Sequence, residues 1–273
     1  MNKRAGAGFY IFLVIFVFLV MFPFIWVFLT SIKPVGEIFT SFKWFTSNPT
    51  TESYEAAVTN RPLMRYMLNS FVVSTVTTVL AVGCAAFAAY AVTRLPIKGK
   101  GLFLGVVLAA SMFPQVAVIS PIFNIVTELG LRNSYTGLVI PYMTISLPLS
   151  IWILSTFFQK IPFELEESAK LDGASPFQTF RKIILPLATP GIFTTAILVF
   201  IAAWNEYLFA LTINSDDVWR TVPVGISMYQ SEYSVPWGDI SAATVIVTIP
   251  IVILVLIFQR RIVSGLTSGS VKE

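Results

Sequence analysis

The chain has 273 residues, of which 56% are hydrophobic and 12% charged, with a formal net charge of +4 and a mean hydropathy of +0.79. This composition excludes an ordinary soluble domain, because too few polar residues are available to cover a folded surface in water. There is no histidine, and the single cysteine, Cys84, cannot form an intrachain disulfide. The composition therefore predicts an integral membrane protein and gives no indication of a metal site.

Charge-free runs along the chain are long enough to cross the hydrocarbon core as helices, which takes about 20 residues. They cover residues 9–32, 66–93, 101–127, 133–159, 183–205 and 240–259. The third run contains Pro114 and Pro121 and the fourth Pro141 and Pro148, so we expect both to be kinked or to lie partly outside the lipid. The sequence therefore predicts an all-α fold with six transmembrane helices.

The first run follows Lys3 and Arg4 and could be mistaken for a secretion signal. It is too long for the apolar part of a signal peptide and has no small-residue cleavage pattern before Lys33, so we expect a retained helix. If the N-terminus is cytoplasmic, the inner segments carry 12 Lys and Arg residues and the outer segments 6. This bias predicts that both termini are cytoplasmic, and it explains the net positive charge without a nucleic-acid partner.

The second run carries Ala81, Ala85 and Ala89 at a spacing of four residues. On a helix this spacing places all three on one face, where small side chains allow close approach of a neighbouring helix. We expect this face to serve helix packing rather than substrate contact.

Residues 160–186, called the polar loop below, form the longest inner loop between runs in this topology. Pro162 suits a first helical position, and Glu164, Glu166 and Glu167 suit the positive end of the helix dipole. Gly173 is placed to end this helix in a left-handed cap. The pattern therefore predicts an ordered first helix and a turn.

A second helix is predicted directly after the turn. Ser175 can cap it, with Pro176 at its first position and Gln178 completing a capping box. We expect one apolar face and a basic last turn, formed respectively by Phe177, Phe180 and Ile184 and by Arg181 and Lys182. An amphipathic segment lying on the membrane is an alternative, although the acidic first half suits a protein partner better.

The polar loop resembles the cytoplasmic signature of binding-protein-dependent ABC importer permeases, written EAA, three residues, G, nine residues, I-x-L-P. Glu167-Ser168-Ala169, Gly173, Ile183 and Leu185-Pro186 match it, with Ser168 in place of the usual first alanine. The wider pattern resembles the carbohydrate subgroup, called MalG-type. Further agreement lies at Asn69-Ser70, at Trp204-Asn205-Glu206-Tyr207 and in the chain ending, so the resemblance covers essentially the whole chain.

The resemblance implies a type I importer permease whose polar loop carries the helix that docks on a separate cytoplasmic ATPase. Glu167 would pair with a basic residue of that ATPase, and Gly173 would permit the turn. The implied ATPase-coupling residues are Glu167, Ser168, Ala169, Asp172, Gly173, Ile183, Leu185 and Pro186.

The chain ending has no helical period after Arg261 and is rich in small residues. A disordered terminus is one interpretation. The resemblance implies instead that the tail enters the cleft between two ATPase subunits, with contacts from Gly265, Thr267, Ser268 and Gly269.

The chain lacks the G-x-x-x-x-G-K-[ST] phosphate loop, so we do not expect it to hydrolyse ATP or to be an enzyme. The resemblance implies that ATP and Mg are bound by the partner ATPase and that this chain binds no cofactor. It implies as partners a second, homologous permease, two cytoplasmic ATPase subunits, an extracytoplasmic solute-binding protein and a carbohydrate substrate. The implied location is the cell membrane of a prokaryote.

Asn205, Glu206 and Tyr207 stand near the outer end of the fifth run. Ionisable residues within a membrane are costly and are often functional, so an outer gate or a sugar contact is one interpretation. A solvated carboxylate in an interfacial aromatic belt is the other. The outer aromatic residues Trp44, Tyr54, Trp219, Tyr229, Tyr233 and Trp237 likewise fit either a docking surface for a binding protein or ordinary interfacial positions.

The expected organisation is a first helix with an outer segment (1–67), a permease core (68–260) and a cytoplasmic tail (261–273). An ion-coupled secondary transporter, working without an ATPase, is the alternative function. One near-surface carboxylate and no histidine would make a poor ion relay, and the polar loop would then have no role. A membrane-embedded enzyme would need a cluster of catalytic polar groups, and the sequence contains none that we can assemble.

Overall fold

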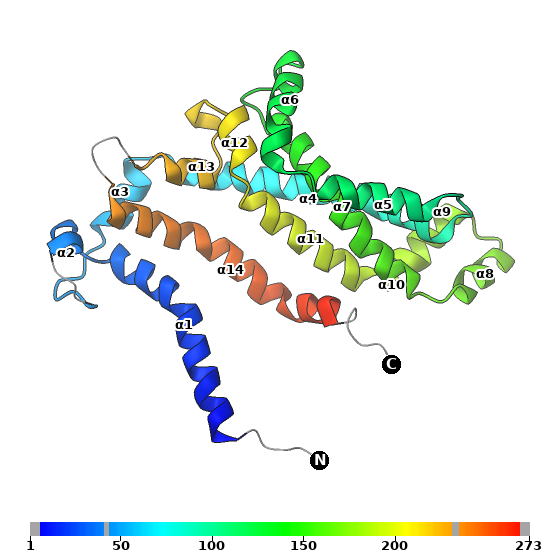
Figure 1. The fold of residues 1–273 in the computed structure, drawn as a ribbon, viewed down its shortest axis with the longest axis horizontal. Coiled ribbons are helices and arrows are strands. Elements are labelled where there is room, and N and C mark those ends of the chain that lie inside the picture. The colour runs from blue at the N-terminus through cyan, green and yellow to red at the C-terminus, as the bar shows by residue number, and fades with distance from the viewer. Residues whose placement is uncertain (1–5, 41–43, 231–234, 268–273) are drawn as a thin grey trace. The chain divides into compact units, whose positions relative to one another are not determined.

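The computed structural model describes residues 6–40, 44–230 and 235–267, with side chains for all of these except 7, 40 and 260–267. Every regular element in this part of the chain is a helix, which confirms the expected all-α fold (Figure 1). The chain forms two compact units, Met1–Met64 with Gly225–Pro250 (unit 1) and Arg65–Val224 with Ile251–Glu273 (unit 2). The predicted core of residues 68–260 stays a prediction, and it includes a segment that belongs to unit 1.

Unit 1 contains α1 (Ala7–Ser31), α2 (Val35–Thr40), α3 (Glu52–Thr59) and the first part of α14 (Trp237–Thr267). Unit 2 begins within α4 (Leu63–Arg94) and holds the remaining helices up to α13 (Val222–Ser227), where the chain returns to unit 1. These are α5 (Lys100–Ser111), α6 (Gln115–Glu128), α7 (Tyr135–Gln159), α8 (Glu164–Leu171), α9 (Pro176–Thr179), the π-helix η1 (Phe180–Ile184), α10 (Leu185–Leu187), α11 (Thr189–Trp204), α12 (Leu208–Ile213) and the 3-10 helix η2 (Asp217–Trp219).

Among the described helices, α1, α4, α7 and α14 are each long and apolar enough to cross a membrane. Two bent pairs raise the number to six if each counts as one span: α5 with α6, bent by 92°, and Pro176–Leu187 with α11, bent by 76°. The first bend lies at Pro114, as predicted, because proline ends the preceding helix. In contrast, α7 runs unbroken through Pro141 and Pro148.

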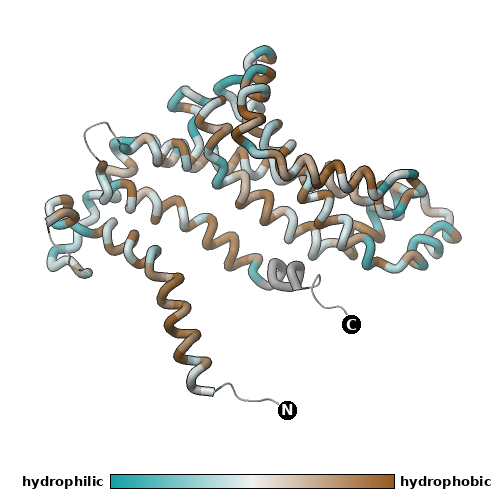
Figure 2. The backbone as a smooth tube through the Cα atoms, viewed as in Figure 1, coloured by the Kyte–Doolittle hydropathy of each residue, from teal (hydrophilic) through white to brown (hydrophobic). Residues whose placement is uncertain are grey.

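Helix α1 is apolar along its whole length (Figure 2). None of the residues in its most apolar window is buried within the chain. Its C-terminal end is fixed inside unit 1, where the hydroxyls of Ser31 and Tyr54 lie 2.7 Å apart. Tyr229 is also held within this unit, because its hydroxyl donates to the Ala57 carbonyl oxygen over 2.7 Å, and burial raises its pKa to about 12. Two of the outer aromatic residues therefore have packing roles.

The core of unit 2 lies between α4, α7 and α11. Ala81, Ala85 and Ala89 are completely buried in it, which confirms the predicted packing face of α4. Helix α11 packs against α7 at Gly191, where an added Cβ would lie 2.4 Å from the Phe157 ring. Only glycine permits this approach. The polar loop therefore begins and ends at two helices, α7 and α11, that are closely packed against each other.

The N-terminal end of α4 is attached to the segment before α13 by side chains that lie near the start of the second apolar run. Asn69 is buried and donates from Nδ2 to the carbonyl oxygens of Val218 and Arg220, both over 2.8 Å. Its Oδ1 accepts from the Tyr135 hydroxyl over 2.9 Å, and Ser70 Oγ accepts from the Val222 N–H over 2.8 Å. Asn69 and Ser70 therefore stabilise the packing of the first turns of α4 against residues 218–222.

Candidate functional site

The polar loop has the ordered helix–turn–helix form that the sequence predicts. Helix α8 ends in a turn at Gly173, whose φ of +81° lies in the left-handed region that glycine adopts without strain. Ser175 and Gln178 form the predicted capping box: Ser175 Oγ accepts from Gln178 N over 3.3 Å, and Gln178 Oε1 accepts from Ser175 N over 2.8 Å. The start of α8 differs, because the helix begins at Glu164 and Pro162 lies before it.

The second half of the loop departs from a regular helix. After one turn of α9 the backbone widens into the π-helix η1, which contains Arg181 and Lys182. Phe180 and Ile184 are buried as predicted, but Phe177 is 59% exposed. The expectation of one continuous apolar face was wrong, because Phe177 precedes the widened turn, which changes the angular spacing of the residues that follow.

The turn brings most of the implied coupling residues together around one groove of about 460 Å³. Its lining includes Ser168, Ala169 and Asp172 from the first arm and Ile183 and Pro186 from the second. Glu167 is exposed beside it, and no ion pair or hydrogen bond of its side chain is found among the described residues. The exposed carboxylate therefore directly precedes, in the chain, two residues that line the groove, Ser168 and Ala169.

Large apolar side chains lie in and beside the polar loop without cover from the described part of the chain. Leu171 is 89% exposed, and Phe163, Phe177 and Leu187 are each more than half exposed. Apolar groups beside polar ones in this density are typical of a protein–protein contact.

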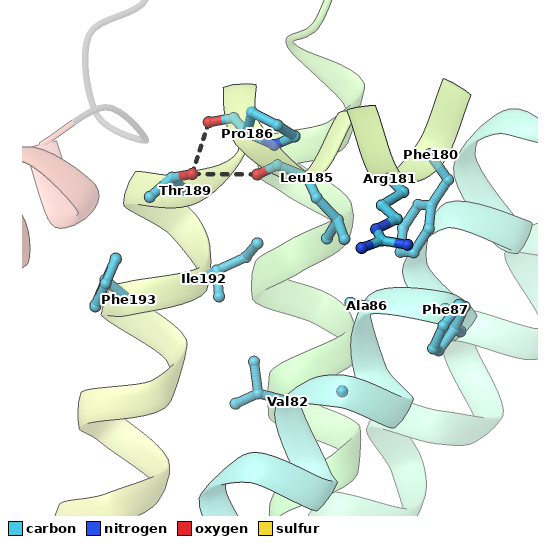
Figure 3. Close-up of a pocket in the computed structure, with 11 residues that line it drawn as sticks. Val82, Ala86, Phe87, Phe180, Arg181, Leu185, Pro186, Thr189, Ile192 and Phe193 are labelled. Carbon is cyan, nitrogen blue, oxygen red and sulfur yellow. Dashed lines mark hydrogen bonds between the residues drawn. The ribbon is translucent and has the colours of Figure 1, made fainter. Parts of the chain in front are cut away.

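The remaining coupling residue, Leu185, faces a second cavity of about 570 Å³ on the opposite side of the segment. This cavity has mostly apolar walls from α4, η1, α10 and α11, including Val82, Phe87 and Ile192. Figure 3 shows that the Arg181 side chain points from η1 toward it. The segment from η1 to α10 therefore contributes side chains to both hollows, and Pro186 lines each of them.

The inner face of the polar loop is attached to α4 by residues that sequence reasoning missed. The Phe180 ring lies 5.0 Å from that of Phe87 and 4.9 Å from that of Tyr90, measured between centroids. Arg94, in the last turn of α4, forms an ion pair of 3.0 Å from its Nε to Glu166 Oε1. The sequence showed Arg94 only as one of the inner positive charges, because an arginine after an apolar run is common at any membrane boundary.

Glu206, the candidate for an outer gate, has partners within its own segment. Its two carboxylate oxygens accept from the backbone N–H groups of Phe209 (2.9 Å) and Ala210 (3.1 Å) at the start of α12. Asn205 donates to the Ile201 carbonyl oxygen over 2.8 Å, and Tyr207 is 36% exposed. This geometry identifies Glu206 as a helix cap, a role that neither sequence interpretation included.

The chain ending is helical further than expected. Helix α14 continues to Thr267, so Gly265 and Thr267 lie in a helix where the sequence predicted none. Ser268 and Gly269 lie outside the described residues, as does Tyr233 among the outer aromatic residues. Within residues 6–40, 44–230 and 235–267 there is also no group of three His, Cys, Asp or Glu residues that could hold a metal ion.

The described part of the chain is a helical membrane protein with an ordered polar loop between two candidate spans. The model of the family described as "Binding-protein-dependent transport system inner membrane component" matches residues 81–268, and this chain belongs to that family.

Curated relatives confirm the resemblance to carbohydrate permeases. The chain is 45% identical to the trehalose transport system permease protein SugB of Mycobacterium tuberculosis, over 92% of each chain. It is 43% identical to the sulfoquinovosyl glycerol transport system permease protein SmoH of Agrobacterium fabrum, over 92% of this chain and 88% of that one. It is 42% identical to the trehalose/maltose transport system permease protein MalG of Thermococcus litoralis, over 92% and 91%.

Among solved structures, a bacterial ABC transporter that imports the acidic polysaccharide alginate matches with a TM-score of 0.81 and 20% identity, over 95% of this chain and 99% of that one. This likeness supports the fold of an ABC importer permease.

Proposed function

We propose that this chain is a permease subunit of an ATP-driven importer that moves a sugar or oligosaccharide across the cell membrane of a prokaryote. The observation that carries the proposal is the polar loop, whose first helix presents Glu167 to solvent beside a groove while its turn is fixed by Gly173 and a capping box. An acidic surface of this kind suits a basic site on a cytoplasmic ATPase. ATP and Mg would be bound by that ATPase.

The mechanism of this importer would depend on the rigid attachment of the polar loop to the membrane helices. If both ends of the polar loop stand on packed helices, closure of the two ATPase subunits displaces the loop and the helices that carry it. A second, homologous permease would supply the other half of the pathway. ATP binding then favours one of two packed arrangements of the helices, and substrate alternately reaches the outer and the inner side.

The substrate and the outer partner are proposed from the relatives. The names of three of them refer to trehalose, to trehalose and maltose, and to sulfoquinovosyl glycerol, and others are diacetylchitobiose uptake permeases. One structural neighbour was solved in complex with an alginate pentasaccharide-bound periplasmic protein. A carbohydrate delivered by an extracytoplasmic binding protein is therefore the substrate class to test first.

The test is co-purification of this chain from its native membrane, followed by ATPase measurement in proteoliposomes. We expect two ATPase subunits and a second permease per complex. Binding protein loaded with one of a panel of sugars (trehalose, maltose, diacetylchitobiose, sulfoquinovosyl glycerol) should stimulate ATP hydrolysis. Sugar uptake driven by an ion gradient without ATP would overturn the proposal and support a secondary transporter.

The chain ending is proposed as a second contact with the ATPase pair, through Gly265, Thr267, Ser268 and Gly269. The small residues of this segment suit a narrow cleft. Truncation after Arg261 should leave the complex assembled through the polar loop but lower ATPase retention and transport. Full ATPase stoichiometry together with the parental transport rate would assign the tail no role.

A further inference from the structure

Arg94 holds the inner end of α4, the end of α7 and the start of α8 together. Its guanidinium group donates to the carbonyl oxygens of Phe158 and Ile161, the latter over 2.6 Å, and pairs with Glu166. The guanidinium carbon lies 4.2 Å from the centre of the Phe163 ring. The side chain is only 1% exposed, and that of Glu166 only 9%.

The chemistry of this contact favours a fixed geometry. The accepting carbonyl groups lie at or just after the C-terminal end of α7, where the helix dipole is negative. Arg94 is itself the last residue of α4, so its positive charge also stabilises the negative end of that helix dipole. Nη2 donates to both carbonyl oxygens while Nε lies beside the Glu166 carboxylate, so one planar group fixes the orientation of both elements, whereas a lysine would place a point charge on a flexible stem. Removing one partner of such a buried pair leaves the other charge unpaired at high cost.

The same face of the loop has a second attachment to α4. The Tyr90 hydroxyl lies 3.4 Å from Glu166 Oε2, and the Tyr90 ring packs on Phe180 of η1. Tyr90 and Arg94 are one helical turn apart, so one stripe of α4 contacts both arms of the polar loop. A force applied to α8 therefore reaches α4 directly as well as through the covalent connections to α7 and α11.

From these contacts we propose that Arg94 is the positioning residue through which a displacement of α8 moves α4 as a rigid body. Helix α4 runs from Arg65 to Arg94 within unit 2, a length of about 45 Å at 1.5 Å per residue. Its outer end is fixed to the 218–222 segment by Asn69 and Ser70. The pair Arg94–Glu166 would thus connect ATPase closure to the outer side of the permease. This inference rests on the proposed coupling role of the polar loop.

The experiment compares variants in the assembled complex. Arg94→Met removes the cation and keeps an unbranched apolar stem, Arg94→Lys keeps the charge, and Glu166→Gln keeps the shape while losing the ion pair. Lys98→Met is the matched control, because Lys98 is an exposed cation in the turn that follows α4. Two quantities are measured per assembled complex: the ratio of ATPase rates with and without sugar-loaded binding protein, and the distance between spin labels on α4 and α8.

We expect Arg94→Met and Glu166→Gln to lower the stimulation ratio about threefold to thirtyfold and to broaden the distance distribution. Arg94→Lys should recover part of both, and Lys98→Met should match the parent. If Arg94→Met does not assemble, Glu166→Gln decides the question. A parental ratio and a parental distance in Glu166→Gln would overturn the inference.

The two proposals fail in different ways. Loss of coupling in Glu167→Lys with parental behaviour of Arg94→Met and Glu166→Gln would leave the docking surface intact as a proposal and remove only the role of Arg94. Parental coupling in Glu167→Lys would disprove the proposal that the polar loop is the docking surface for the ATPase.

Discussion

The polar loop and segment 205–220 both interrupt the apolar runs of unit 2 with carboxylates and a short helix. In segment 205–220 the carboxylates have partners within the chain: Glu206 accepts from backbone N–H groups at the start of α12, and Asp217 accepts from Tyr66 of α4 over 2.6 Å and pairs with Arg220 over 2.6 Å. In the polar loop the turn is equally ordered, but Glu167 extends into solvent. A carboxylate with partners in its own chain stabilises the fold, whereas one held on a rigid element without such partners is available to another protein.

The largest effect is expected for Glu167→Lys. Charge reversal turns an attractive contact with a basic ATPase site into a repulsive one of several kcal/mol if the site excludes water. Uptake should be abolished while the amount of protein in the membrane stays at the parental level, as measured by transport assay and immunoblot. Glu164→Lys, an exposed acid on the same helix, is the control. Normal substrate-stimulated ATPase activity in Glu167→Lys would disprove the coupling assignment.

Asn69→Leu should give the next largest effect, on stability. It removes three hydrogen bonds of a completely buried side chain, to the carbonyl oxygens of Val218 and Arg220 and from the Tyr135 hydroxyl, at a cost of about 3 kcal/mol. Thermal unfolding of the purified protein in detergent measures the loss. Asn205→Leu, at an exposed site, should shift the unfolding temperature much less. Equal shifts for both variants would contradict the stabilising role of the Asn69 hydrogen bonds at the N-terminal end of α4.

Gly173→Val should lower the yield of assembled complex. An added Cβ meets no atom within 4 Å, so the cost is that of a β-branched residue in the left-handed region, about 1 to 2 kcal/mol. Gly173→Asn is the control, because asparagine tolerates this conformation. Assembly and transport of the valine variant at the parental level would mean that the turn is assigned wrongly.

The smallest effect is expected for Glu206→Gln. The amide oxygen can still accept one hydrogen bond, but the charge at the start of α12 is lost, at about 1 kcal/mol. We expect a changed uptake rate or apparent affinity with intact ATPase docking, measured by transport kinetics and co-purification. A lower unfolding temperature with unchanged kinetics would limit Glu206 to its capping role.

Local patterns in the sequence predicted the parts of the site that depend on neighbouring residues. The turn at Gly173 and the capping box of Ser175 and Gln178 were correct, because each needs only a few consecutive residues to satisfy its backbone groups. The start of α8, the exposure of Phe177 and the helical ending at Thr267 were missed. These depend on packing and on helix continuation, which short patterns do not resolve.

The sequence by itself determined that this is a helical membrane protein and where its polar loop turns, since apolar run length and backbone capping are local properties. Only the tertiary structure decided which charges have partners. Arg94 and Glu166 are 72 positions apart; the sequence showed one as an inner positive charge and the other as an acid in the first turns of a helix, yet they meet in a buried pair. Pairing of this kind depends on how distant helices pack, and it separates the structural charges from those left to bind a partner.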